Sequence, residues 1–281
     1  WMLSANGTLF TYEFEAIIPG LLKRWYAERK EMQRKMQESG SNEIERTYWD
    51  KRQLVKKINL NSLYGALLNP GCRFFDIRIG QSVTLTGRCI TKHMAAKVNE
   101  IIAGKYNHHG ESIIYGDTDS VYFTAHKTLS KEINSGQIPW TKESVIALYD
   151  KIAEEMNTSF TSFMSKAFHC PSTRGSVIRA GRELVASKGL FITKKRYAVL
   201  YYDIEGNRTD IAGKEGKMKA MGLDLKRSDT PVFVQDFLSE ILYMVLQGKT
   251  EKEVLEAITN FRTQFKAKPG WEKGSPKRAN N

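Results

Sequence analysis

Cysteine and long apolar runs are what this chain has least of. Its 281 residues include three cysteines, Cys72, Cys89 and Cys170, which are odd in number, widely spaced and without a metal-ligand pattern. This scarcity argues against a disulfide-built secreted domain and favours a reducing, intracellular setting. No apolar run approaches the roughly 20 residues of a membrane helix, and no signal peptide is visible. We therefore predict a cytoplasmic protein that no helix anchors in a membrane.

Acidic residues are also too few to balance the basic ones. The chain has 43 Lys and Arg against 31 Asp and Glu, which gives a formal net charge of +12. A basic excess of this size favours a polyanionic partner, but the sum alone leaves nucleic acid, acidic membrane and acidic protein open. The hydrophobic content of 41% is ordinary and supports a buried core.

The pattern of apolar residues, caps and breakers predicts an α+β fold. One helix runs from Pro19 to Ser39, and a second follows Asn42 and continues to Gly65. With a tight link between them, they form a long antiparallel helical hairpin of roughly 30 Å. Further helices are expected over residues 81–103, 141–166, 231–248 and 251–266. β-Structure is expected over 1–12 and 112–123, and in strands over 176–178, 183–185, 190–192 and 197–202. Residues 213–228 are expected to form a flexible basic connector.

The segment 115–120 reads Tyr-Gly-Asp-Thr-Asp-Ser and lies between two short β-branched runs. This predicts a β-hairpin with carboxylates at its turn. Side chains alternate along a strand, so Asp117 and Asp119 can point the same way. Two like charges held together need a cation between them, and oxygen ligands suit Mg²⁺. The alternative is an ordinary Asp-rich turn.

Both helices of the predicted hairpin carry cations on faces that should be dry. Arg29 interrupts an apolar stripe on the first helix, and Lys57 shares a stripe with Asn61 and Tyr64 on the second. An Arg fork and a Lys point charge suit a triphosphate. The alternative is a snorkelling cation on each helix.

Three cations and an aromatic residue lie between two of the predicted strands. This cluster, held on a sheet, suits contacts with nucleic-acid phosphates. The alternative is a solvated basic turn. The residues are Lys194, Lys195, Arg196 and Tyr197.

Three of these segments resemble motifs of family B DNA polymerases, particularly replicases of the T-even bacteriophage type. Residues 57–65, Lys-Ile-Asn-Leu-Asn-Ser-Leu-Tyr-Gly, resemble the fingers motif. Residues 115–120 resemble the palm motif, and 194–197 resemble the later Lys-Lys-Arg-Tyr motif. The motifs occur in the family's order, and the resemblance runs from about Trp1 to Phe265.

The resemblance implies a DNA-directed DNA polymerase that uses two Mg²⁺ ions. Asp119 would be the chief metal ligand and Asp117 would set the metal geometry, with Lys195 acting beside them. Asp203 would be a supporting carboxylate, with the capping of a turn as the alternative. A polymerase of this kind acts in the cytoplasm, that of the host cell if the chain is viral.

The resemblance also assigns the contacts with dNTP and primer–template DNA. Arg29 and Lys57 would grip the triphosphate, while Asn61 and Tyr64 would pack against the nascent base pair. Four residues would hold the primer–template near its growing end: Lys194, Lys195, Arg196 and Tyr197.

The resemblance further implies fingers over 1–65, with a preceding strand pair, and a partial palm over 66–228. The start of a thumb would cover 229–267, and a disordered tail 268–281. The family's Asp-x-x-Ser-Leu-Tyr-Pro-Ser strand, which also selects the sugar, does not occur in this sequence. We therefore expect a piece of a polymerase that needs a missing N-terminal polymerase and exonuclease part. A sliding clamp is a further partner implied by the family, although no contact region for it is recognisable.

Two interpretations of a different kind remain open. The chain could be a non-catalytic nucleic-acid-binding remnant that keeps the basic surface and turns nothing over. A metal-dependent nuclease is a weaker third interpretation, because the stripe from Lys57 to Tyr64 would then have no role.

Overall fold

The computed structural model describes residues 1–211 and 213–274, which form two compact units. The first unit comprises Trp1–Met94 and Thr158–Ile178, and the second comprises Ala95–Asn157 and the chain from Arg179 onward. Within the described ranges, no helix is both long enough and apolar enough to cross a membrane.

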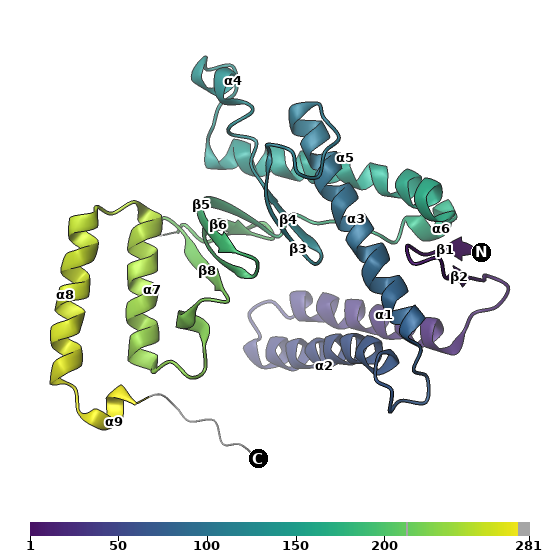
Figure 1. Ribbon diagram of the computed structural model, residues 1–281, viewed down its shortest axis with the longest axis horizontal. Helices are drawn as coiled ribbons and strands as arrows, with labels where there is room; N and C mark the ends of the chain where they lie inside the picture. The colour runs from purple at the N-terminus through teal and green to yellow at the C-terminus, as the bar shows by residue number, and fades with distance from the viewer. Residues whose placement is uncertain (212, 275–281) are drawn as a thin grey trace. The chain divides into compact units, whose positions relative to one another are not determined.

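Helices and antiparallel strands make up both units (Figure 1), which confirms the predicted α+β class. The helices are α1 (Ile17–Glu38), α2 (Glu43–Leu67), α3 (Ile77–Ala103), α4 (Ser130–Asn134), α5 (Lys142–Phe168), α6 (Ser172–Gly175), α7 (Val232–Gln247), α8 (Glu251–Ala267), α9 (Gly270–Lys273) and the 3₁₀ turn η1 (Asp224–Lys226). The strands are β1 (Met2–Leu3), β2 (Leu9–Phe10), β3 (Ile113–Asp117), β4 (Ser120–Phe123), β5 (Leu184–Thr193), β6 (Arg196–Ile204), β7 (Asn207–Arg208) and β8 (Lys217–Met221).

The first unit contains the predicted hairpin of two long helices, α1 and α2, which lie side by side (Figure 1). The side chain of Asn42 caps α2 by accepting a hydrogen bond from the backbone N–H of Glu45 at 3.2 Å. The apolar core of this unit lies elsewhere, around Met164, Phe168 and Cys170 of α5 and the segment after it. The α1–α2 hairpin is therefore held by a half-buried seam instead of a dry core, because α1 has no buried residue.

The second unit is built on the antiparallel sheet β5-β6-β7, with β8 paired to β6. Val185 and Tyr202 of the sheet pack with Val145 of α5. A second apolar cluster joins the sheet to α7 and to the segment after β8. Its buried members are Ala198, Leu200, Ala220, Leu223, Leu225 and Leu246.

Strand β8 lies in the segment for which we expected a flexible connector, and that expectation is wrong. Residues 217–221 pair with Tyr197–Tyr201 of β6, and Ala220 is buried. The lysines at 217 and 219 alternate with apolar residues, so the segment has the period of a half-buried strand. The glycines that suggested a linker are needed at both ends of β8, because Gly216 and Gly222 have φ values of +143° and +62°.

Three smaller expectations also differ from the structure. The strand expected over 176–178 is absent; Val177 and Ile178 instead donate backbone hydrogen bonds to the carbonyl oxygens of Arg174 and Gly175 in α6. The two strands expected over 183–185 and 190–192 are one strand, β5, interrupted by bulges. In the tail, residues 270–273 form the helical turn α9, while 275–281 lie outside the described residues.

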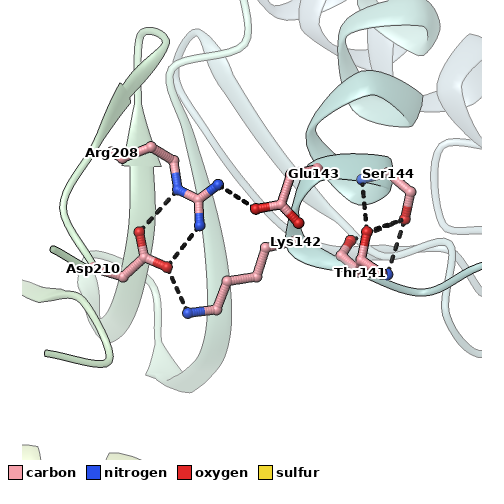
Figure 2. A network of polar contacts seen from close by, with 6 residues as sticks. All are labelled: Thr141, Lys142, Glu143, Ser144, Arg208 and Asp210. Carbon is pink, nitrogen blue, oxygen red and sulfur yellow. Dashed lines mark hydrogen bonds and ion pairs between the residues drawn. The ribbon is translucent and has the colours of Figure 1, made fainter. Parts of the chain in front are cut away.

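Four charged side chains tie the start of α5 to the β6–β7 hairpin (Figure 2). Arg208 donates to both carboxylate oxygens of Asp210, at 2.8 and 2.7 Å, and to Glu143 at 2.6 Å. Lys142 completes the network with a 2.6 Å bond to Asp210. The bonds from Arg208, followed by that from Lys142, hold the pKa of Asp210 well below its ordinary 3.8.

Replacing Asp210 with Asn should lower the free energy of unfolding at pH 7 by about 1 kcal/mol, because two partly exposed cations, Lys142 and Arg208, lose the carboxylate that they share. The depressed pKa of Asp210 means that its contribution is present above pH 3.8 and is lost as the pH falls below that value. Urea denaturation of the wild type and Asp210→Asn should therefore give curves that differ at pH 7 and draw progressively closer as the pH falls below 3.8. Asp236→Asn, at an exposed position on α7, is the matched control; an equal loss in this control would contradict the prediction.

Candidate active site

The acidic segment forms the predicted hairpin, with its carboxylates at the turn. Asp117 ends β3 and pairs with Ser120, so Thr118 and Asp119 make a two-residue turn. Thr118 has a φ of +49° and donates from its hydroxyl to the Asp117 carboxylate at 3.0 Å. Because Asp119 lies in the turn, strand alternation does not bring the two carboxylates to one face, contrary to our expectation.

Neither carboxylate is neutralised by the protein. Within the described part of the chain, no ion pair involves Asp117 or Asp119, and Asp119 is exposed to solvent. Two unpaired carboxylates at one turn are suitable ligands for Mg²⁺, which prefers oxygen. They do not form a complete site, because the described residues contain no group of three His, Cys, Asp or Glu that could hold a metal. The residues present therefore fit a divalent ion as a partial ligand set.

The basic segment lies against this hairpin. Lys194 and Lys195 connect β5 to β6, and Lys195 has a left-handed φ of +62°. Its backbone N–H donates to the hydroxyl of Tyr115 at 2.6 Å, across 80 residues of sequence. The structure thus brings together two of the segments that the sequence singled out.

An aromatic cluster supports the contact between the two hairpins. Tyr115 and Tyr122 of the acidic hairpin lie 6.0 Å apart between ring centroids and pack with Phe191 and Tyr197 at centroid distances of 5.3 to 5.5 Å. The hydroxyl of Tyr122 donates to that of Tyr197 at 3.1 Å. Burial, reinforced by this hydrogen bond, raises the pKa of Tyr122, so the phenol stays protonated at neutral pH. Tyr197 is therefore a packing residue of this cluster.

Gly222, which the sequence analysis missed, supports the basic turn from β8. A Cβ atom at this position would lie 2.0 Å from the carbonyl oxygen of Lys195. The signal that could have revealed this residue is the alternation of residues 217–221, which ends at a glycine.

Asp203 has a structural role, in agreement with the turn-capping alternative. Its side chain is 2% exposed and accepts hydrogen bonds from Arg182 and from the backbone N–H of Gly206, the latter at 3.1 Å. Arg182 also donates to Asp150 at 2.5 Å. These partners leave Asp203 engaged inside the fold.

In the α1–α2 hairpin, Arg29 lies in the seam as expected. It is half-buried, and its Nε donates to the amide oxygen of Gln53 at 3.2 Å. Tyr64 is also half-buried and donates from its hydroxyl to the carbonyl oxygen of Gly80 at 3.2 Å. Both side chains are therefore fixed by hydrogen bonds within the first unit.

The position of Lys57 differs from our expectation. Lys57 and Asn61 are exposed on α2, and the cation that enters the seam is Lys56. The Lys56 ammonium lies 2.5 Å from Glu28 and 5.5 Å from the ring centre of Trp25. Consecutive residues of an α-helix are rotated by 100° about its axis. The stripe that contains Lys57 and Asn61 therefore runs beside the seam, which is formed by residues 49, 53, 56 and 60. Lys57 thus lies on an accessible face, and no carboxylate of the described residues forms an ion pair with it.

The chain belongs to DNA polymerase family B. The family's model matches residues 6–269, which is nearly the whole chain. This confirms the family to which the three motifs pointed.

The relatives include polymerases of T-even-type phages. The chain is 34% identical over 205 residues to the DNA-directed DNA polymerase of Escherichia phage RB69, covering 69% of this chain and 22% of that protein. It is 30% identical over 223 residues to that of Enterobacteria phage T4, covering 76% and 24%. It is 27% identical over 259 residues to a DNA polymerase of Pyrococcus glycovorans, covering 90% and 28%. The chain thus spans about a quarter of the length of these relatives.

Replacing Gly222 with Ala should destabilise the second unit, because the new methyl group would overlap the Lys195 carbonyl. The matched control is Gly206→Ala, at a turn with a φ of +84° and no atom within 4 Å of the added Cβ. The control should cost about 1 kcal/mol for the left-handed backbone alone. Gly222→Ala should cost about 1–3 kcal/mol more, measured by urea denaturation. Equal losses in the two variants would show that the close approach to Lys195 has no energetic consequence.

Proposed function

We propose that this chain is the fingers, part of the palm and the base of the thumb of a DNA-directed DNA polymerase. The α1–α2 hairpin corresponds to the fingers, the sheets of the second unit to the palm, and α7 with α8 to the start of the thumb. The observation that carries this proposal is the hydrogen bond between Lys195 and Tyr115, which brings a basic turn against an acidic hairpin. Carboxylates beside cations suit a reaction between a metal-bound triphosphate and a nucleic-acid end.

The reaction is an in-line displacement in which the primer 3′ oxygen attacks the α-phosphorus of a dNTP and pyrophosphate leaves. Asp119 and Asp117 would hold Mg²⁺, which would supply positive charge to stabilise the negative charge on the attacking and leaving oxygens. The ammonium of Lys195 contributes positive charge beside these carboxylates. Lys194 and Arg196 bind primer–template phosphates, and Tyr197 maintains the turn that presents them.

The fingers bind the incoming nucleotide. Arg29 and Lys57 neutralise the triphosphate, which lowers the cost of bringing an oxygen nucleophile to it. Asn61 and Tyr64 contact the nascent base pair from the same helix. The remaining ligands come from a part of the polymerase upstream of this segment. Two predictions concern the whole enzyme: that it binds a sliding clamp, and that it acts in the cytoplasm of an infected cell.

The incomplete metal site supports the alternative of a nucleic-acid-binding remnant, because the described residues supply two carboxylates at one turn and no third. The two functions differ in one observable. The polymerase extends a primer when the upstream part is supplied, and the remnant binds DNA without turnover.

Replacing Asp119 with Ala should abolish primer extension by the chain reconstituted with the upstream polymerase part, dNTPs and Mg²⁺. We expect a loss of at least about 1,000-fold, as for the removal of a group that stabilises transition-state charge. DNA affinity should change less than about twofold, because the cations of residues 194–196 remain. Asp236→Ala on α7 is the matched control and should extend normally.

Extension by Asp119→Ala at the control rate would contradict the proposed role of the hairpin. A wild-type reconstitution that binds DNA but extends no primer would favour the remnant, and degradation of the DNA in Mg²⁺ would favour a nuclease. The chain alone should give no extension.

A further inference from the structure

Gln53 of α2 lies opposite Arg29 of α1 in the seam of the helical hairpin. Its amide oxygen accepts a hydrogen bond from Nε of Arg29 at 3.2 Å. Its amide nitrogen donates to the carboxylate of Asp50, one turn earlier on α2, at 2.9 Å. Gln53 thus connects an exposed carboxylate on its own helix to a half-buried cation on the neighbouring helix.

The Asp50 contact fixes which end of the amide faces Arg29. An ionised carboxylate only accepts hydrogen bonds, so the Gln53 NH₂ group must point toward Asp50. The amide oxygen is then left for Arg29, whose guanidinium only donates. The two hydrogen bonds that link Asp50, Gln53 and Arg29 therefore each pair a donor with an acceptor, and they are compatible with only one orientation of the Gln53 amide.

The neutral partner leaves the charge of Arg29 intact. Among the described residues, no carboxylate forms an ion pair with Arg29, and the adjacent Glu28 is engaged by Lys56 at 2.5 Å. The hydrogen bond from Lys56 lowers the pKa of Glu28, which keeps that carboxylate ionised and paired. The bond to Gln53 uses Nε alone, so the four terminal N–H groups of Arg29 remain available to an anion.

We propose that Gln53 is a positioning residue that holds the Arg29 guanidinium in the orientation that binds the triphosphate of the incoming nucleotide. This inference rests on the proposed function of Arg29. A free Arg side chain loses rotamer entropy when it binds an anion, and a side chain that is already held loses less. A carboxylate would hold the side chain equally well but would cancel its charge, whereas an amide orients the cation without neutralising it.

The test compares two substitutions of Gln53 in the full 281-residue chain. Gln53→Met keeps the length and removes the acceptor, while Gln53→Glu keeps the acceptor and adds a negative charge. The matched control is Gln37→Met on the exposed side of α1. Two NMR measurements are made on each variant: the rate at which the Arg29 Nε–H proton exchanges with water, and the affinity for dATP with Mg²⁺ from a shift titration.

We expect Gln53→Met to speed the exchange of the Arg29 proton and to weaken dATP binding about three- to tenfold, the cost of one newly mobile side chain. Gln53→Glu should keep the proton protected and still weaken binding, because the charge of Arg29 is then compensated. Gln37→Met should match the wild type in both measurements. The two measurements distinguish a positioning role from a purely structural contact. Loss of a purely structural contact would lower the thermal midpoint of unfolding but would leave the dATP affinity unchanged.

The outcomes separate this inference from the function on which it rests. If Arg29→Ala weakens dATP binding but Gln53→Met leaves it unchanged, the positioning role is wrong and the proposed function stands. If Arg29→Ala itself leaves dATP binding unchanged, the role of Arg29 in the proposed function is wrong. Should Gln53→Met unfold, the affinity and exchange of Gln53→Glu decide, and unchanged affinity in that variant overturns the inference.

Discussion

A cation can attract an external anion only if it is held in place without being neutralised, and the cations of the proposed nucleotide and DNA sites are subject to this constraint. Structural cations are paired with carboxylates: Arg182 with Asp203, and Arg208 with Asp210. Arg29 is instead held by a neutral amide. Lys195 is fixed through its backbone N–H, which leaves its ammonium group out of the hydrogen bond that positions the residue. A neutral amide or a hydroxyl brings no negative charge, so the cations keep their full attraction for phosphate.

The same constraint explains why the basic turn depends on distant parts of the second unit. Arg196 lies 4.0 Å from Asp224, but within the described part of the chain no ion pair involves Lys194 or Lys195, so this part of the turn is held by its backbone and by packing. Tyr115 and Tyr197 supply a hydroxyl and an aromatic contact, and β8 brings Gly222 against the Lys195 carbonyl. The left-handed backbone of Lys195 is kept in place by these contacts. Loss of any one should loosen the turn before it unfolds the sheet.

Structural features that have a local sequence signal could be predicted from the sequence. Features that depend on tertiary contacts could not. The cap at Asn42 and the left-handed Gly248 after α7 mark helix ends, and those helices were predicted within a few residues. Strand β8 was missed because its two lysines and flanking glycines are also typical of a linker, and only pairing with β6 distinguishes the two. Lys57 was placed in the seam in place of Lys56, since neighbouring helical positions differ by 100° and composition does not fix the rotation of a helix.

The site residues follow the same division. The hairpin that carries Asp117 and Asp119 was predicted correctly because its turn is a local signal, but the segment that packs against it lies 80 residues away. Mg²⁺ takes six oxygen ligands, and two carboxylates offer at most four. The remaining oxygens must come from another carboxylate, from water or from the triphosphate. Under the proposed function, metal binding at this hairpin would be coupled to nucleotide binding, because a nucleotide would supply both phosphate oxygens and negative charge. Arg29, which forms no ion pair with a described carboxylate, would favour the same assembly from the triphosphate side, so the affinities for metal and for nucleotide should rise together.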